Sequence, residues 1–402
     1  MIVSHRSNVW GAQRRLFGLM PGLAERGVVF SLAAPPDTLL TEQWLERGLP
    51  YVPLELPVHR GLRRTDGQGR PSPLALAREA AVVAESTRRI RAVVRGADVV
   101  LSYSLNAHVE VVAAARLARR PVVVEVVDLV RPGVGLQLLR AASRLASATV
   151  VNSSATAAMF GPPGRAGIHL IHPGVDLERF RPGPPPDGLR AELSGAPELP
   201  LVGIVGRVDP EKGVHVLVRA MDLLRQKGVD ARMVVVGEAG ADGEEYAATV
   251  RREASAALGD RVRFAGRRHD VPEVLRGLDV LVNASRAEPF GLSVLEAQAT
   301  GVPVVATDAG GIPDFVEDGV TGLLVPPDDP VALAGALRRL VADPSLRHRL
   351  GAAGRRHAVD HHALDDQYDR RAAVYHAAAG RGAGHPPASR YAAGSADAPA
   401  AE

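Results

Sequence analysis

Residues 279–315 read DVLVNASRAEPFGLSVLEAQATGVPVVATDAGGIPDF, and this stretch decides the fold class. The apolar run at 278–282 predicts a short buried strand, because it is rich in β-branched residues and ends in turn-forming residues. From Leu292 onward the apolar residues recur at helical spacing until Gly301, where a helix is expected to end. A second buried strand is expected at 303–307. Strand, loop, helix and strand in this order indicate an α/β fold with a parallel sheet.

Two glutamates and a glycine occupy the expected loop and helix. Glu288 falls in the loop at the carboxyl end of the first strand, Gly291 opens the helix, and Glu296 lies inside it. The first amides of a helix have no partner within the helix and favour an anion such as phosphate. Two carboxylates that bracket a diphosphate, each able to accept from sugar hydroxyls, predict a nucleotide-sugar site. The alternative is a loop glutamate in solvent and a helix glutamate on a polar face.

The spaced string in this stretch resembles the family 4 glycosyltransferases, which are retaining enzymes of the GT-B fold. The matching residues are Glu288-Pro289-Phe290-Gly291, Glu296-Ala297, Gly301, Pro303 to Thr307, and Gly310-Gly311. The resemblance implies that the first glutamate contacts the donor sugar and that the second contacts the ribose.

A pair of basic residues follows another expected strand, at 201–205. Arg207 and Lys212 lie five residues apart in a loop that is bounded by Gly206 and Gly213. Arginine binds phosphate as a fork and lysine as a point charge, so the two can converge on one diphosphate. The same pattern is also typical of a solvated loop. It resembles the G-R-x-x-x-x-K-G motif of the family, whose two basic residues hold the donor diphosphate.

The resemblance implies two further donor contacts. The segment 262–268 is similar to the part of the family that cradles the nucleotide base, and backbone contacts are expected from about Arg267. Gly11 follows Trp10 where the family often has a Gly-Gly motif beside the transferred sugar. This chain keeps half of that motif, so Gly11 is either a donor contact or part of a tight turn.

One position departs from the family. Many relatives have His-Asp after the strand expected at 121–127, whereas this chain has Val127-Asp128. His5 or His108 could compensate, since both fall near strand carboxyl ends, where open α/β sheets bind ligands. The alternative is that each is an ordinary surface or packing histidine.

The expected GT-B fold has two Rossmann-like domains with parallel sheets that face each other across an interdomain cleft. Residues 1–181 are expected to form the acceptor-side domain, and 201–355 the donor domain. The proline-rich range 182–200 predicts a linker. A helix at 356–377 is expected to cross back to the N-terminal domain, and the low-complexity tail 378–402 is expected to be disordered.

Composition excludes several classes of protein. The formal charge of the 402 residues is only +3, and no basic stripe with interleaved aromatic residues occurs, so nucleic-acid binding is not expected. The chain has no cysteine, no 18-residue apolar run and no leader peptide, which favours a cytoplasmic protein. The basic, glycine-rich range 59–73 is either a solvated loop or a contact for an anionic acceptor or the inner face of the membrane.

These observations predict a hexosyltransferase-type enzyme that moves a glycosyl group from a UDP- or GDP-linked sugar to an acceptor hydroxyl with retention. The acceptor would be a carbohydrate, a lipid-linked molecule or a natural product. Glu288 would orient the sugar, while Arg207, Lys212 and the amides at Phe290-Gly291-Leu292 would stabilise the departing diphosphate. No cofactor and no metal are expected, because no Asp-x-Asp motif occurs and the basic pair supplies the positive charge.

Rival interpretations remain at this point. A sugar-nucleotide epimerase would convert its donor without an acceptor, and a phosphorylase would depend on inorganic phosphate. A binding subunit that has lost catalysis would bind the nucleotide and leave every donor intact.

Overall fold

The structure is a computed structural model of the 402-residue chain. It describes every residue except 5–10, 58–72, 104–106, 163, 241–242 and 381–402. His5, nearly all of the basic range 59–73 and nearly all of the expected tail therefore lie outside the described residues.

The chain folds into two compact units. The N-terminal unit comprises the described residues of Met1–Val151 and Ala157–Ile171 together with 365–380. The C-terminal unit comprises Asn152–Thr156 and the described residues of His172–Leu364. Each unit has its own parallel sheet, as the alternation of strands and helices predicted.

Among the described residues, the sheet of the N-terminal unit has seven strands in the order β3-β2-β1-β4-β5-β6-β7, and all neighbours are parallel. The strands are β1 (Ile2–Val3), β2 (Leu32–Ala34), β3 (Tyr51–Pro53), β4 (Val100–Ser102), β5 (Val122–Val126), β6 (Ala148–Val151) and β7 (Ile168–Leu170). Most of these strands are buried, which explains why they read as continuous apolar runs in the sequence.

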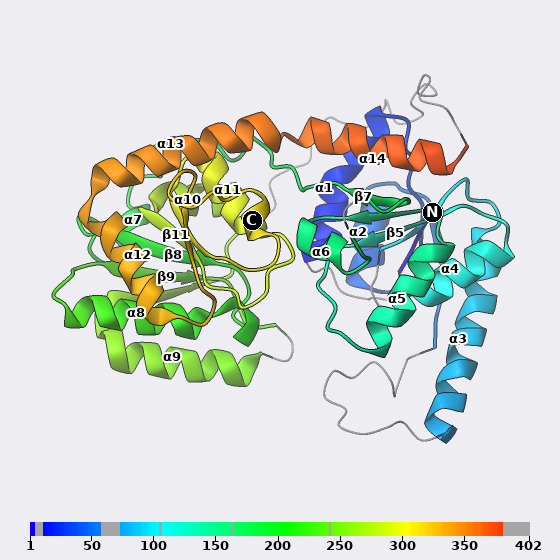
Figure 1. Cartoon of the computed structure of the whole chain (residues 1–402), viewed down its shortest axis with the longest axis horizontal. Coiled ribbons are helices and arrows are strands. Elements are labelled where there is room, and N and C mark those ends of the chain that lie inside the picture. Colours follow the sequence, from blue (N-terminus) through cyan, green and yellow to red (C-terminus); the bar gives the residue numbers. More distant parts are fainter. Residues whose placement is uncertain (5–10, 58–72, 104–106, 163, 241–242, 381–402) are drawn as a thin grey trace. The chain divides into compact units, whose positions relative to one another are not determined.

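Helices cover both faces of this sheet (Figure 1). They are α1 (Gly11–Glu25), α2 (Leu39–Glu46), α3 (Pro73–Val94), α4 (His108–Leu117), α5 (Val134–Leu145) and α14 (Leu364–Ala378). The short helix α6 (Ser154–Ala158) has residues in both units. The inner residues of α3, α4 and α5 share one core with alternate residues of β5. The helices α1 and α14 pack closely where Gly22 faces the ring of Tyr368. This close approach is possible because glycine has no β-carbon, which would lie 2.1 Å from the ring.

A buried ion pair attaches α14 to β5. Glu125 points to the opposite face of the sheet from its apolar neighbours on the strand, and it accepts hydrogen bonds from Arg371 and from the hydroxyl of Tyr375, the latter at 2.5 Å. Glu125 and Arg371 are completely buried. Burial alone would lower the pKa of Arg371, but the charge of Glu125 raises it above its ordinary value. The guanidinium therefore stays charged inside the unit.

The sheet of the C-terminal unit has six parallel strands among the described residues, in the order β10-β9-β8-β11-β12-β13. The strands are β8 (Leu201–Val205), β9 (Arg232–Val236), β10 (Val262–Gly266), β11 (Val280–Asn283), β12 (Val304–Thr307) and β13 (Leu323–Val325). The chain moves outward in one direction from β8 and in the other direction from β11. The order of the strands thus reverses between these two neighbours.

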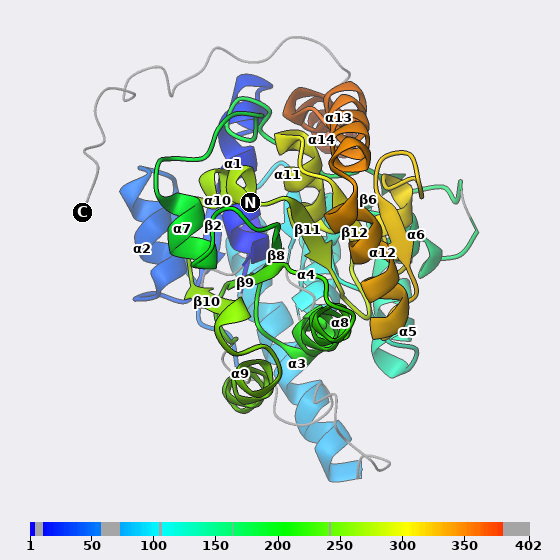
Figure 2. The ribbon, with the colours of Figure 1, turned by 90° about the vertical axis from the view of Figure 1, so that its left-hand side faces the viewer.

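Two helical layers enclose this sheet. The helices are α7 (Leu189–Ser194), α8 (Val214–Gln226), α9 (Glu244–Leu258), α10 (Val271–Gly277), α11 (Leu292–Thr300), α12 (Pro330–Ala342) and α13 (Pro344–His361), with 3-10 turns η2 (Pro210–Lys212), η3 (Gly259–Arg261) and η4 (Ile312–Asp314). One core contains α8, α9 and α12, and the other contains α7, α10 and α11. Figure 2 shows α8 and α9 end-on, on the same side of the sheet.

The range 182–200 is not a free linker. It contains α7, which packs against β9 and β10, and the range falls within the C-terminal unit. Leu189 and Leu193 are buried because their spacing of four residues places them on one face of a helical turn. The density of prolines predicted the absence of a strand but concealed this short helix. Which unit holds the donor and which holds the acceptor stays a prediction.

No helix within the described part of the chain combines the length and the apolar character that a membrane crossing requires.

Candidate functional site

The candidate site lies at the carboxyl edge of the sheet in the C-terminal unit. In open α/β sheets, ligands bind outside the carboxyl ends of strands where the strand order reverses. This reversal falls between β8 and β11, which pair directly. The loop after β8 carries Gly206, Arg207 and Lys212, and the loop after β11 carries Glu288. The sheet topology therefore brings together two loops that are far apart in the sequence, since Lys212 and Glu288 are separated by 76 positions.

Lys212 and Glu288 form an ion pair. The ammonium of Lys212 donates to Oε2 of Glu288 at 2.7 Å, and both side chains are largely buried. Asn283 and Ser285 also donate to the same oxygen, at 3.2 and 3.0 Å. No hydrogen bond to Oε1 of Glu288 occurs among the described residues, and Oε1 is not one of the fully buried polar atoms. One carboxylate oxygen thus fixes the side chain, while the other is available to a ligand.

The backbone around this pair leaves no space for side chains at two glycines. Gly310 has a φ of 63°, and a β-carbon there would lie 1.9 Å from the carbonyl oxygen of Glu288. Gly213 has a φ of 67°, and a β-carbon there would lie 2.0 Å from the carbonyl oxygen of Ala284. The amide of Gly311 donates to the Glu288 carbonyl at 2.9 Å. The segment after β12 and the start of α8 therefore pack tightly against the loop that carries Glu288.

The helix α11 begins directly after this loop. Gly291 occupies the N-cap position with a φ of 104°, and no side chain caps the helix. The first amides of α11 are therefore left for another partner, which an anion satisfies best. Leu292 is exposed at this end of the helix. The structure thus places the expected amide donors at the same strand-loop-helix junction as Glu288.

The ring of Phe290 is a packing group. It is buried and stacks on Phe315 at a centroid distance of 4.6 Å, with His172 and His362 at 5.7 and 5.9 Å. Burial lowers the pKa of His362 to about 4, so this histidine is neutral at pH 7. Only the backbone of Phe290 is placed to meet a ligand. Its side chain anchors the loop.

Arg207 remains accessible in the loop after β8. Its guanidinium pairs with Asp209 at 3.1 Å, and 57% of its side chain is exposed. Asp209 also accepts from the backbone amide of Lys212 at 3.1 Å and so caps the turn η2. A single carboxylate therefore restrains both basic residues of the motif without burying the arginine.

Gly206 and Arg267 lie at the same edge of the sheet. Gly206 follows β8, and its carbonyl oxygen is so close to Gly237 that a β-carbon there would lie 1.8 Å away. The amide of Gly237 in turn donates to Gly266 at 2.7 Å, and Arg267 follows as an exposed residue. Three successive strand ends, β8, β9 and β10, are thus joined through short glycine contacts.

Glu296 has an unusual protonation. It lies on α11 and is half-buried, and desolvation raises its pKa to about 7 against a smaller opposing effect of Arg179. At neutral pH the carboxyl group is therefore close to half-protonated. A ligand that donates hydrogen bonds to it would favour the ionised form.

The remaining expected residues belong to the N-terminal unit. Gly11 is the first residue of α1. His108 is buried, and its Nδ1 shares a hydrogen bond of 2.6 Å with Ser102, so its imidazole is a packing group of the sheet edge. The structure thus assigns no ligand-facing role to His108 as a substitute for the family histidine at Val127.

Asn283 and Ser285 are site residues that the sequence analysis did not identify. Both hold Glu288, and Ser285 also accepts through its carbonyl from the hydroxyl of Thr307 at 2.6 Å. Their position gave a signal, since polar residues at the carboxyl end of a buried strand face the ligand edge of a parallel sheet. Lys212, which the sequence did identify, carried a further signal, because it is one of only two lysines in the chain, the other being Lys227.

Comparisons with known structures define the class of this fold. The protein Alr3699/HepE of Anabaena, solved in complex with UDP and glucose, matches 92% of this chain and 97% of its own with a TM-score of 0.74 and 24% identity. The sucrose-phosphate synthase tll1590 of Thermosynechococcus elongatus matches 94% of this chain and 98% of its own with a TM-score of 0.72 and 22% identity. The expected α/β class and GT-B fold are confirmed.

The sequence comparisons find one matching family and several relatives. Residues 189–357 match the family described as glycosyl transferases group 1. The D-inositol 3-phosphate glycosyltransferase of Streptomyces avermitilis is 36% identical over 231 residues, which are 56% of this chain and 49% of the relative. That of Catenulispora acidiphila is 35% identical over 257 residues, 62% of this chain and 60% of the relative. The chain thus spans about half the length of the first of these relatives.

Proposed function

We propose that the protein transfers a glycosyl group from a nucleoside diphosphate sugar to an acceptor hydroxyl with retention of anomeric configuration. The observation that carries this proposal is the Lys212–Glu288 pair beside the uncapped start of α11, at the point where the strand order reverses. This arrangement offers positive charge, free amides and one accessible carboxylate oxygen within a single strand-edge site. A diphosphate with a sugar attached requires these three features.

The reaction would use the site in a defined way. The bond between the anomeric carbon and the diphosphate oxygen breaks, the acceptor oxygen forms the new bond to that carbon, and the acceptor's proton passes to the departing diphosphate. Negative charge builds on the departing diphosphate. Arg207, Lys212 and the amides at the start of α11 would stabilise this charge, and preorganised donors of this kind contribute about 3 kcal/mol each.

The two glutamates would hold the rest of the donor. Oε1 of Glu288 is the oxygen that remains for a sugar hydroxyl, because three donors already occupy Oε2. Glu296 would accept from the ribose hydroxyls. The segment at Gly266-Arg267, exposed at Arg267, would meet the base through its backbone. The expected contact of Gly11 with the transferred sugar stays a prediction.

The names of the matched proteins support particular substrates. The Anabaena structures contain UDP, UDP with glucose, or UDP-glucose, which favours a UDP-linked donor over a GDP-linked one. The curated relatives are named D-inositol 3-phosphate glycosyltransferases, which favours a polyhydroxylated acceptor. A lipid-linked or natural-product acceptor and a cytoplasmic site of action stay predictions. We also propose that no metal ion is needed, since two basic side chains already face the diphosphate position.

The first test is to remove the charge pair. Lys212→Ala and Glu288→Ala should each lower kcat by about 100- to 1000-fold, because each removes a contact made to the reacting donor. Turnover of UDP- and GDP-sugars with a panel of acceptors measures this effect, and turnover should be unchanged in a metal chelator. The matched control is Lys227→Ala, which removes the exposed lysine at the far end of α8 and should leave kcat within twofold.

The rival activities give different results in the same assays. Conversion of the donor without an acceptor would indicate an epimerase, and dependence on inorganic phosphate would indicate a phosphorylase. Binding of nucleoside diphosphate with no turnover of any donor would indicate a binding subunit. Normal turnover in both Lys212→Ala and Glu288→Ala would disprove the proposed site.

A further inference from the structure

The helix α5 of the N-terminal unit exposes an apolar stripe. Its inner face is formed by Leu136, Leu139 and Ala142, which are buried in the core. Its outer face presents three large apolar residues that follow helical spacing, Val134, Leu138 and Leu145, with exposed fractions of 75, 47 and 55%. No other helix in the described part of the chain exposes more than two large apolar residues. The helix is therefore apolar on two faces, and only one of them is covered within the unit.

The charge around α5 has a single sign. The range 129–175 contains no aspartate or glutamate. It contains four arginines, Arg131, Arg140, Arg144 and Arg165. The chain as a whole has nearly balanced charge, with 48 basic and 45 acidic residues, so this range of uniform charge is a local feature. An exposed apolar stripe beside arginines is the pattern of a helix that lies in the interface of an anionic membrane.

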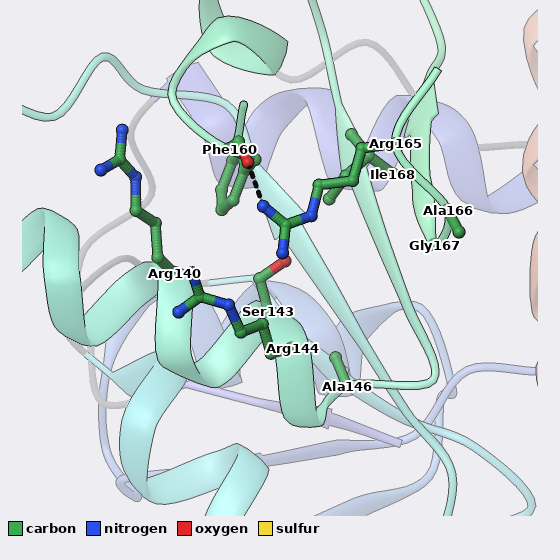
Figure 3. Close-up of a pocket in the computed structure, with 9 residues that line it drawn as sticks. All are labelled: Arg140, Ser143, Arg144, Ala146, Phe160, Arg165, Ala166, Gly167 and Ile168. Atoms are coloured by element: carbon green, nitrogen blue, oxygen red, sulfur yellow. Dashed lines mark hydrogen bonds between the residues drawn. The ribbon is translucent and has the colours of Figure 1, made fainter. Parts of the chain in front are cut away.

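A pocket of about 200 Å³ opens beside this face, and three of the four arginines line it (Figure 3). Arg140 donates to the carbonyl of Met159 at 2.6 Å, and Arg165 donates to the carbonyl of Phe160 at 2.7 Å. These bonds leave further N–H groups on both guanidinium groups. Arg144 has no hydrogen bond or ion pair within the described residues. The pocket has room for a phosphate group, since a water molecule occupies about 30 Å³ of liquid volume.

We propose that α5 and this arginine pocket form a docking surface for a membrane of anionic phospholipids, with the pocket taking a headgroup phosphate. The leucines would enter the acyl boundary, and the arginines would meet the phosphates. Two other occupants are excluded, each for its own reason. A second copy of the chain docked symmetrically on α5 would place arginines against arginines. A nucleic acid would gain nothing from the exposed leucines, and the only aromatic residue of the range, Phe160, is buried.

The position of α5 gives the surface a use. The helix begins eight residues after the last residue of β5, so its first turn lies near the edge of the sheet where ligands of α/β units bind. A membrane held along α5 would present molecules embedded in it close to that edge. The surface does not depend on the proposed transfer reaction, because its test needs no substrate.

The experiment is co-sedimentation of the full chain with vesicles. Vesicles of phosphatidylcholine mixed with phosphatidylglycerol should pellet the protein, vesicles of phosphatidylcholine alone should not, and high salt should release it. Arg144→Ala and Arg165→Ala should each weaken partitioning about fivefold, since one basic residue near an anionic surface contributes about that factor. The pair Leu138→Gln with Leu145→Gln should weaken it about tenfold or more.

Matched controls come from the same unit. Arg91→Ala on α3 and Leu45→Gln on α2 remove side chains of the same type and of comparable exposure from helices other than α5, and they should change partitioning less than twofold. All substituted residues are exposed or lie at the rim of the pocket. A melting temperature equal to that of the unmodified chain verifies that each variant folds.

Four outcomes would overturn the proposal. The first is equal pelleting by both kinds of vesicle, or none, and the second is equal partitioning of the α5 variants and the controls. The third is calorimetric binding of inorganic phosphate, lost in Arg144→Ala, without any binding to vesicles, which would indicate a site for a small anion. A dimer that dissociates in the leucine variant, again without vesicle binding, would assign the face to a second copy.

Discussion

The ion pair between Glu288 and Lys212 leaves both side chains able to bind a nucleotide sugar. One oxygen of the Glu288 carboxylate accepts three hydrogen bonds. The ammonium of Lys212 can donate further hydrogen bonds, because it carries three N–H groups. A diphosphate that approaches the start of α11 can therefore bind Lys212 without displacing it from Glu288. The pair fixes the site before the donor arrives, which lowers the cost of reorganisation during the reaction.

Glu296 supplies a prediction about protons. Its pKa of about 7 lies above the ordinary value of 4.5, so near pH 7 the free protein carries a proton there about half of the time. If the ribose donates its hydroxyls to this group, the carboxylate form is favoured and the pKa falls. Binding of an intact nucleoside diphosphate sugar, whose phosphates carry no proton near pH 7, should then release up to about half a proton. Calorimetry in buffers of different ionisation enthalpy measures this number.

The variant Glu296→Gln isolates that group. It should bind with no release of protons near pH 7. It should also gain stability relative to the unmodified chain as pH rises from about 5 to 8, because the ionised form of a group with a raised pKa destabilises the folded state. Proton release that persists in Glu296→Gln would contradict the assignment of this residue to the ribose.

The sequence identified the charged residues of the site but not the groups that hold them. Glu288 stood out because the string around it is specific, and Lys212 gained weight because its shorter motif lies in the same expected domain. Asn283 and Ser285 did not, since the direction of a side chain in the loop after a strand depends on backbone turns that periodicity does not reveal. Likewise, the string around Phe290 could not show that its ring points into the core while its backbone faces the ligand edge.

At the scale of elements, the segment after β12 packs against the loop that carries Glu288 and fixes the position of that loop. Gly310→Ala should be strongly destabilising, because a β-carbon would lie 1.9 Å from a carbonyl oxygen that has no room to move. The substitution should lower turnover as well, since the displaced carbonyl belongs to Glu288. Urea unfolding and the transferase assay measure the two effects.

Gly319→Ala is the matched control. Gly319 has a φ of 73°, close to the 63° of Gly310, but no atom lies within 4 Å of the position of its β-carbon. Only the strain of a left-handed conformation should appear there, about 1–2 kcal/mol. An equal loss of stability in the two variants, with normal turnover in Gly310→Ala, would mean that the close contact has no role at the site.

Most strands and long helices were predictable because apolar residues follow each period clearly. The exceptions are short or polar elements. The helix α7 occupies the proline-rich range, and only two leucines carry its signal.

At the scale of the whole molecule, the buried pair of Glu125 and Arg371 attaches the last helix to the first sheet. Arg371→Met should destabilise the N-terminal unit by about 3–5 kcal/mol, because it leaves a buried carboxylate without its countercharge. The double variant Glu125→Leu with Arg371→Met should recover much of that loss. Arg370→Met, which breaks an exposed pair with Asp366 in the same helix, should cost less than about 1 kcal/mol.

Urea unfolding followed by hydrogen exchange in α14 measures these changes. A single variant Arg371→Met as stable as the unmodified chain would show that the ion pair is not what retains the helix. The pairing itself could not be predicted from the sequence. The two residues are 246 positions apart, and a glutamate within an apolar strand gives no indication of its partner.

The scarcity of lysine at the site has a practical consequence. With 46 arginines and only two lysines, the chain offers reagents that acylate primary amines few targets besides the α-amino group. Modification at position 212, read by mass spectrometry of peptides, becomes a footprint of donor occupancy. Protection there by a given nucleotide sugar, with Lys227 as the internal reference, would rank candidate donors before any acceptor is known.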